Sequence, residues 1–122
     1  MSNDSAATEW ESKAAEWVRH REIYDRAFAT VTDAVLERAD LRPGHRVLDV
    51  GCGAGTLLSR AHELGALPYG VDISAPMVSA ARERVLAATV VTADAQEADL
   101  LAETGSAPFD RIVSRFGVMF FS

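Results

Sequence analysis

The first third of the chain carries apolar residues at helical spacing. Between residues 10 and 35 they recur at steps of three, four or seven, and no glycine or proline occurs before Pro43. Such spacing places one face of a helix against a core. Thr8 and Glu11 have the spacing of a capping box, so a first helix is predicted to begin near residue 8. A break is expected between residues 20 and 24, and a second helix should end before residues 42–44.

Beyond Pro43 the pattern changes to short apolar or β-branched runs that alternate with helical segments. Gly65 should stop one of these helices, and Ser74 should cap the next, with Pro76 tolerated in its first turn. Strands that alternate with helices form βαβ units. The pattern therefore predicts an α/β fold, a Rossmann-like parallel sheet with helices on both faces. Strands are predicted at 46–50, 69–73, 89–94 and, with its exit loop, 109–117, and helices at 56–64, 74–88 and 97–103.

Length, charge and cysteine content restrict the class of protein. The 122 residues suffice for one compact domain, and the formal net charge is -6. Lysine and arginine are scattered rather than gathered on one face, so nucleic acid is not an expected partner. The single cysteine excludes an intramolecular disulfide and a cysteine-rich zinc site, and no metal site is expected. No signal peptide or membrane-length apolar run is evident, so we expect a cytoplasmic location and no membrane partner.

The stretch VLDVGCGAG, residues 47–55, points to a ligand. A buried strand leads directly into Gly51, Gly53 and Gly55. Glycine is favoured where the chain needs a positive φ or where the backbone approaches a ligand. In open parallel sheets, ligands bind at the carboxyl edge, where this loop should lie. Dinucleotide-binding loops carry a glycine where this chain has Thr56, so a nicotinamide cofactor is disfavoured.

Three aspartates stand at the ends of the first three predicted strands. Asp49 suits an ammonium, bound directly or through water, or a structural role. Asp72 follows the glycine loop by about twenty residues, where a carboxylate can accept hydrogen bonds from both ribose hydroxyls. Asp94, followed by Ala95, would lie near the edge of an adenine. Helix capping or solvation is the alternative for Asp72 and Asp94.

Four blocks of sequence, in this order, resemble the class I S-adenosylmethionine-dependent methyltransferases. They are VLDVGCGAG, YGVDISAPMVSAARERV, VVTADAQEADL and FDRIVSRFGVMFF, within residues 46–121. The resemblance implies S-adenosylmethionine as cofactor and methyl transfer as activity. It also implies four strands, in order 3-2-1-4, of a seven-stranded fold. The expected domains are an N-terminal helical cap, 1–42, and a cofactor-binding domain, 43–122, truncated after the fourth strand. Such a chain is expected to be poorly active alone.

The same resemblance assigns roles around the cofactor. The glycine loop would pass beneath the methionine part, Asp72 would bind the ribose, and Ile73 would flank the adenine. Asp94 and Ala95 would bind the adenine edge, and the backbone of residues 114–116 would contact the methionine end. Arg115 fits a buried partner of Asp49 as well as a carboxylate ligand. The expected cofactor-binding residues are Asp49, Gly51, Cys52, Gly53, Gly55, Asp72, Ile73, Asp94, Ala95 and Arg115.

Catalytic residues and the acceptor cannot be identified from these motifs. Cys52 is expected to be a small loop residue rather than a nucleophile. The expected acceptor is a small molecule with an O, N, C or S nucleophile. The alternative is a non-catalytic S-adenosylmethionine-binding module or an incomplete subunit, and edge-to-edge self-association along the fourth strand is a candidate interaction. The aromatic stripe Trp10, Trp17, Tyr24 and Phe28 should pack helices, or else line a substrate opening.

Overall fold

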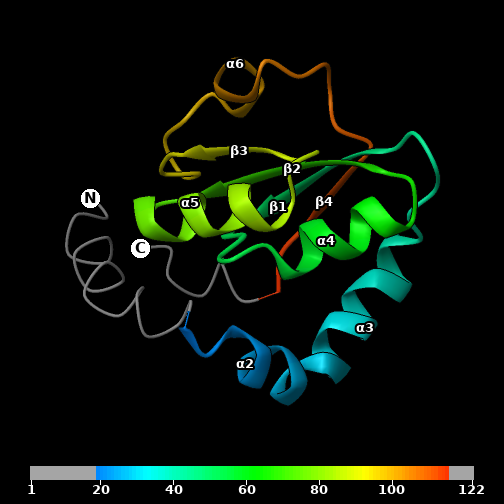
Figure 1. The fold of residues 1–122 in the computed structure, drawn as a ribbon. Coiled ribbons are helices and arrows are strands. Elements are labelled where there is room, and N and C mark those ends of the chain that lie inside the picture. The colour runs from blue at the N-terminus through cyan, green and yellow to red at the C-terminus, as the bar shows by residue number, and fades with distance from the viewer. Residues whose placement is uncertain (1–18, 116–122) are drawn as a thin grey trace.

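The structure, a computed structural model, describes residues 19–115. Two N-terminal helices, α2 (Arg21–Ala27) and α3 (Ala29–Ala39), precede an alternation of strands and helices (Figure 1). His20 lies in a turn directly before α2, inside the interval where a break was predicted, and a second junction falls at Phe28. The predicted helix start near residue 8, with Trp10 and Trp17, lies outside the described residues.

The four described strands form one parallel sheet. They are β1 (Arg46–Val50), β2 (Leu67–Asp72), β3 (Thr89–Thr92) and β4 (Arg111–Val113), in the order β3-β2-β1-β4. In register, Asp49 of β1 lies opposite Gly70 of β2 and Val113 of β4. This order confirms the predicted fold. It also brings the carboxyl ends of β1 and β2, with their aspartates, to adjacent positions on one edge.

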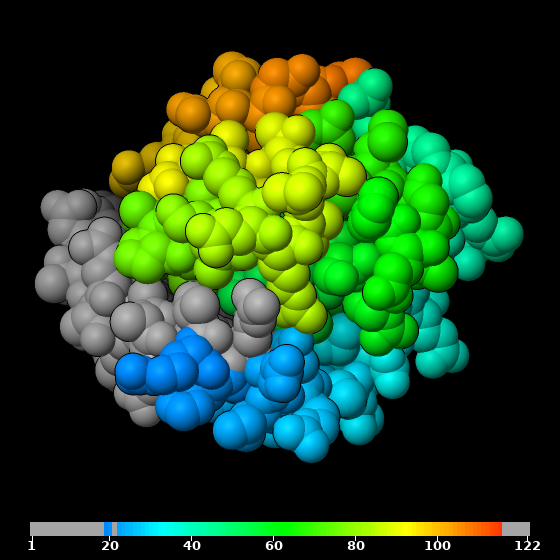
Figure 2. All heavy atoms as spheres, in the orientation of Figure 1, coloured from blue at the N-terminus to red at the C-terminus, as the bar shows by residue number. Residues whose placement is uncertain are grey.

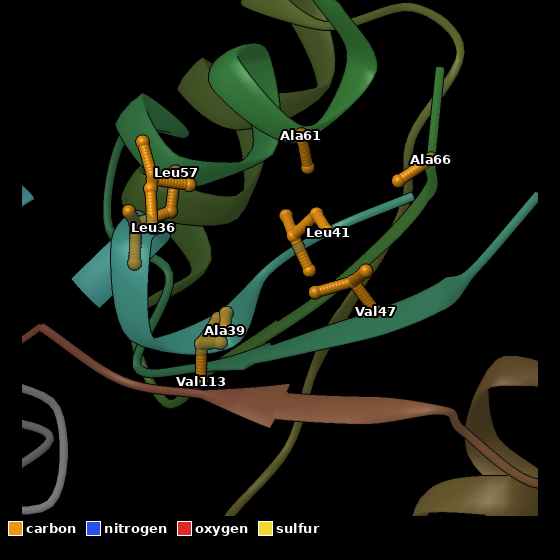
Figure 3. Packing of buried hydrophobic residues seen from close by; sticks show 8 residues of the cluster. All are labelled: Leu36, Ala39, Leu41, Val47, Leu57, Ala61, Ala66 and Val113. Atoms are coloured by element: carbon orange, nitrogen blue, oxygen red, sulfur yellow. The ribbon is translucent and has the colours of Figure 1, made fainter. Parts of the chain in front are cut away.

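Helices cover both faces of this sheet. In Figure 1, α4 (Thr56–Glu63) and α5 (Ala75–Arg84) lie on one face. Figure 3 shows side chains of α3, Leu41 and α4 meeting Val47 of β1 and Val113 of β4. On the opposite face, the cluster of Leu48, Val50 and Val71 packs against residues that include Leu100 of α6 (Leu100–Thr104). The predicted coverage of both faces is therefore observed. The core fixes the strand ends at the candidate site.

Several element boundaries differ from the predicted ones. β2 begins at Leu67 rather than residue 69 and includes Pro68, which faces Val47 of β1 before the pairing with β3 begins. A proline is tolerated at such an end because no ladder partner needs its missing N–H on that side. α5 ends at Arg84 rather than 88, because Val85 leaves the helical conformation. The fourth strand is confined to Arg111–Val113 and the third ends at Thr92.

The caps follow the residue types that the sequence provides. The Ser74 hydroxyl accepts a hydrogen bond from the N–H of Met77, as predicted for the cap of α5. α6 begins later than predicted, because the Asp99 side chain caps it by accepting from the N–H of Ala102. No helix in the range 19–115 has the length and apolar character to cross a bilayer.

Candidate cofactor-binding site

The glycine loop joins β1 to α4 in a left-handed conformation. Gly51, Gly53 and Gly55 have φ angles of 71°, 54° and 97°. The N–H groups of Gly51 and Cys52 donate to the carbonyl of Val71, at 2.8 and 3.0 Å, and so fasten the loop to the end of β2. Residues with a side chain adopt a positive φ only at a cost in strain, whereas glycine adopts it readily. The local conformation therefore accounts for the repeated glycines that the sequence presents.

The surroundings of two loop glycines differ. A Cβ on Gly55 would lie 3.3 Å from the Cα of Ala81 in α5, so this glycine permits close packing of the loop on a helix. A Cβ on Gly53 would meet no atom of residues 19–115 within 4 Å. Among the described residues, the position above Gly53 is therefore unoccupied, and it lies at the carboxyl edge, where a ligand of a parallel sheet is expected.

Asp72 holds the loop and the start of α5 together. Its Oδ2 accepts from the N–H of Gly53 and its Oδ1 from the N–H of Ser74, each at 2.9 Å. Burial raises the pKa of the Asp72 carboxyl, while hydrogen bonds from the N–H groups of Ser74, Gly53 and Ile73 oppose that rise. Each carboxylate oxygen keeps a second lone pair. Asp72 can therefore serve the loop and still accept from a ribose hydroxyl.

The residues expected around the adenine follow β2 and β3. Ile73 comes directly after Asp72, and Ala95 packs partly buried beside the Leu48 cluster. The N–H of Ala93 donates to the Asp72 carbonyl at 3.0 Å, which joins the ends of the two strands. The Asp94 Oδ1 accepts from the N–H of Gln96 at 3.0 Å. The structure thus brings these residues to the same edge as the glycine loop.

Asp49 is the unusual acid of the site. Its side chain is 3% exposed, and its Oδ1 accepts no hydrogen bond from any of residues 19–115. Burial raises the pKa of the Asp49 carboxyl to about 8; the Arg115 charge opposes this rise and the Asp72 charge adds to it. A buried carboxylate without a donor is unfavourable. This side chain is therefore suited to a cation that brings its own N–H donors.

Arg115 lies beyond the end of β4 and is tied to α3. Its Nη1 donates to the Oγ1 of Thr32, itself buried, at 2.9 Å. Burial lowers the pKa of the Arg115 guanidinium, and the charges of Asp25 and Asp49 oppose this effect. Beside it, the Ser114 hydroxyl donates to the Val50 carbonyl at 2.9 Å, so the ends of β4 and β1 are joined. Residue 116, expected near the methionine end, lies outside the described residues.

Cys52 packs inside the loop. Its side chain is 6% exposed, and a Cβ on Gly70 would lie 2.9 Å from its sulfur. Burial raises the pKa of the Cys52 thiol well above its ordinary value, and the Asp49 and Asp72 charges raise it further. A protonated buried thiol is a poor nucleophile. These features favour the packing role over a chemical one.

Sequence reasoning missed several residues around the loop. Gly70 is required because Cys52 and Leu58 press against it, and a glycine inside a predicted strand was a signal for such close approach. Asp25 and Arg84 form an ion pair at 3.0 Å and both contact the Thr56 hydroxyl. Nothing in the local pattern indicated that contact, since the two charges lie far apart in the sequence.

Comparison with known proteins identifies the family. A family profile described as a methyltransferase domain matches residues 47–122. The chain belongs to the class I S-adenosylmethionine-dependent methyltransferases. It is 32% identical over 98 residues to an uncharacterized methyltransferase of Anoxybacillus flavithermus, covering 80% of this chain and 42% of the relative. It is also 32% identical over 105 residues to the malonyl-[acyl-carrier protein] O-methyltransferase of Enterobacter lignolyticus, covering 86% and 39%.

A solved methyltransferase shows the same architecture. The Haemonchus contortus phosphoethanolamine N-methyltransferase 2, in complex with phosphomonomethylethanolamine and S-adenosylhomocysteine, superposes with a TM-score of 0.60 at 30% identity. The match covers 75% of this chain and 22% of that one. The predicted family and fold are thereby confirmed. The chain spans about two fifths of the length of the two curated relatives above.

Proposed function

We propose that this chain binds S-adenosylmethionine at the carboxyl edge of β1 and β2. The observation that carries the proposal is Asp49, a buried carboxyl with an oxygen that accepts no hydrogen bond from residues 19–115. The cofactor's ammonium would supply both the donors and the positive charge that this side chain needs. The open position above Gly53 gives the methionine part room next to it.

The remaining contacts follow from the same placement. Asp72 would accept from the ribose hydroxyls with the lone pairs that its backbone donors leave. Ile73 would flank the adenine, and Asp94 and Ala95 would face the adenine edge. Arg115 would contact the cofactor's carboxylate and, at the same time, balance the charge of Asp49. The groups of this site thus fit an amino acid joined to a nucleoside.

We propose methyl transfer to a small-molecule acceptor as the activity. Bound S-adenosylmethionine supplies a methyl group already activated on a sulfonium. The protein then has to hold the acceptor in line with that methyl and exclude water, and alignment of this kind accounts for roughly 7 to 11 kcal/mol of barrier. The acceptors named for similar proteins include a phosphorylated amine, a carrier-bound malonyl group, a ribosomal protein and RNA. The net charge of -6 and the scattered basic residues favour a small molecule over a nucleic acid for this chain.

The second candidate function is cofactor binding without turnover, by a module or an incomplete subunit. The observation that favours it is that the contacts argued above involve the cofactor, and none of them assigns a residue to the acceptor. The two candidates differ in one assay. Calorimetry with S-adenosylhomocysteine and with NAD establishes the cofactor. Release of S-adenosylhomocysteine from S-adenosylmethionine in the presence of small amines, carboxylates and phenols then detects turnover. Binding with no release from any acceptor would favour the module.

The free side of β4 is our candidate for self-association. Within the described part of the chain β4 pairs only with β1, and Ile112 on it is 67% exposed. An open groove of about 720 Å³ runs beside it, lined by α3 and β4 side chains that include Val31, Val35 and Ile112. Unpaired strand edges with apolar neighbours favour association. Sedimentation velocity should show a concentration-dependent dimer that Ile112→Lys weakens; a monomer at all concentrations contradicts this proposal.

A further inference from the structure

A polar cluster outside the proposed cofactor contacts joins α2 to the two helices on the sheet. Asp25 of α2 pairs with Arg84 of α5 at 3.0 Å. The hydroxyl of Thr56, in α4, donates to the Asp25 carboxylate and accepts from Arg84 Nη1 at 3.2 Å. Figure 2 shows α2, in blue, reaching the end of α5, in yellow-green. One hydroxyl and two opposite charges therefore satisfy one another across three helices.

The burial of this ion pair sets it apart from others in the described chain. The Asp25 and Arg84 side chains are 22% and 24% exposed, whereas those of the Asp33–Arg60 pair are 65% and 45% exposed. Exposed pairs are screened by water and salt and contribute little. A partly buried pair responds strongly when one partner is removed, because the other is left without compensation. The cluster is therefore a stronger link than the Asp33–Arg60 bridge between α3 and α4.

The cluster acts at the end of the glycine loop. Thr56 is the first residue of α4, directly after Gly55. Arg84 is the last residue of α5, the helix whose Ala81 lies under Gly55. An anion near a helix N-terminus and a cation near a C-terminus are both favourable, which matches Asp25 beside α4 and Arg84 on α5. The position of α2 is thus linked to Thr56, which directly follows the glycine loop, and to Arg84, at the end of the helix that packs against Gly55.

Charge links the cluster to Asp49 as well. The Asp25 charge raises and the Arg84 charge lowers the pKa of the Arg115 guanidinium. Burial raises the pKa of Asp49, and the Arg115 charge in turn opposes that rise. α2 otherwise presents much of its surface to solvent, including Glu22, Ile23 and Arg26. A change in the position of α2 on α4 and α5 would therefore alter the contacts of the glycine loop and the electrostatic environment of Asp49.

We propose that Asp25, Thr56 and Arg84 form a clamp that couples the seating of α2 to the shape of the glycine loop. They are positioning residues for S-adenosylmethionine, because they act through the loop rather than by touching the cofactor. This inference rests on the proposed function, in which the loop holds the methionine part. Coupling is reciprocal: if the clamp favours cofactor binding, the cofactor must favour the seated α2.

Thr56 offers the most economical test. Thr56→Val keeps a branched side chain and removes the hydroxyl, whereas Thr56→Ser keeps the hydroxyl. Calorimetry with S-adenosylhomocysteine on the full chain should give a dissociation constant about 5- to 20-fold higher for Thr56→Val and for Asp25→Asn. Thr56→Ser and the control Asp33→Asn, which breaks the exposed bridge to the same helix, should stay near wild type. The double variant Asp25→Asn/Thr56→Val should lose no more affinity than whichever single variant binds S-adenosylhomocysteine less tightly, because the two residues belong to one network.

Hydrogen exchange supplies the readout that a merely structural role would not move. S-adenosylhomocysteine should slow exchange of the α2 amides in the wild type and in Thr56→Ser, and should slow it far less in Thr56→Val. Equal affinities in all variants, or α2 exchange unaffected by the ligand, would overturn the clamp while leaving the proposed function in place. A folded wild-type chain that binds no S-adenosylhomocysteine would overturn both. The wild-type exchange experiment needs no variant to fold.

Discussion

The ends of β1 and β2 each carry an aspartate beside the glycine loop, but the two carboxyl groups are in opposite situations. Asp72 accepts hydrogen bonds from two backbone N–H groups, whereas the buried Asp49 has an oxygen that accepts none from residues 19–115. Asp72 therefore contributes to the loop with or without a ligand. Under our proposal, Asp49 gains its missing hydrogen-bond donor from a ligand. The contrast separates a residue that builds the site from one that depends on what binds there.

The largest effect should follow removal of the residue that builds the site. Asp72→Ala leaves the N–H groups of Gly53 and Ser74 without acceptors. A hydrogen bond to a charged group contributes about 1.5 to 3 kcal/mol, so the free energy of unfolding should fall by at least that much. Binding of S-adenosylhomocysteine should be lost as well. Chemical denaturation and calorimetry measure the two losses; a variant with wild-type stability and affinity would erase the contrast.

Asp49→Asn should separate binding from stability. Calorimetry should show about a tenfold to hundredfold weaker affinity for S-adenosylhomocysteine, because the ammonium loses a charged acceptor. Between about pH 4 and about pH 8, Asp49 keeps its proton in the folded wild type, whereas the same carboxyl is ionised in the unfolded chain. Its free energy of unfolding should therefore fall as pH rises through that window, and the fall should be shallower in Asp49→Asn.

Denaturation at pH 5 and pH 9 checks the pH dependence. If the wild type and Asp49→Asn follow the same stability profile, the raised pKa of Asp49 is wrong. If instead Asp49→Asn loses stability at both pH values to the extent of Asp72→Ala, the two aspartates play the same structural role. Either result would remove the distinction between the two strand ends.

Gly53→Ala should have a smaller effect, confined to the loop between the two aspartates. An L-residue in the left-handed conformation of Gly53 costs about 1 to 2 kcal/mol, so the stability should fall by roughly that amount. Its Cβ meets no described atom within 4 Å, so any additional loss of affinity reports the ligand. Gly44→Ala is the matched control, since it also has a positive φ and an unobstructed Cβ but lies at the opposite edge. Equal affinities in both variants would mean that no ligand passes over Gly53.

The smallest signal is the proton that Asp49 gives up. With a pKa of about 8, this carboxyl is mostly protonated at pH 7 and should ionise when the cofactor's ammonium arrives. Calorimetric titrations in buffers of different ionisation enthalpy should show release of a proton on binding at pH 7, reduced in Asp49→Asn. Uptake of a proton, or release unchanged in Asp49→Asn, would assign the ammonium to another group.

The sequence predicted the parts of the fold that local patterns determine. β1 was correct at both ends, because an apolar run stops at Gly51. The cap at Ser74 was correct for a similar reason, since its hydroxyl serves an N–H three residues later. The predicted end of α5 was four residues too late, because the chain leaves the helical conformation at Val85, whose side chain is buried. Boundaries set by tertiary contacts leave no comparable local trace.

For the candidate site the same division holds. Asp49, Asp72 and the glycines could be found because each lies at the end of a recognisable strand or directly after it. The Asp25 cluster could not, since it depends on how α2 lies across α4 and α5. The Asp49 oxygen that accepts no hydrogen bond could not be predicted either, because burial and the absence of a donor within residues 19–115 are properties of the assembled fold. The sequence identifies which residues can bind a ligand, and the fold shows how each of them is buried and hydrogen-bonded.

The position of the cofactor is most directly tested by two-dimensional NMR of the 15N-labelled chain titrated with S-adenosylhomocysteine. Shifts should be largest for the amides of Gly51, Gly53 and Ile73, at the carboxyl edge. The amides of Gly44 and Gly65, at the opposite edge, should serve as unmoved references; the Gly44 N–H donates to the Gly65 carbonyl and the Gly65 N–H to the His62 carbonyl. Saturable shifts at the first group alone are the predicted result. Shifts centred on the second group, or none in a folded chain, would contradict the assignment of this edge as the cofactor site.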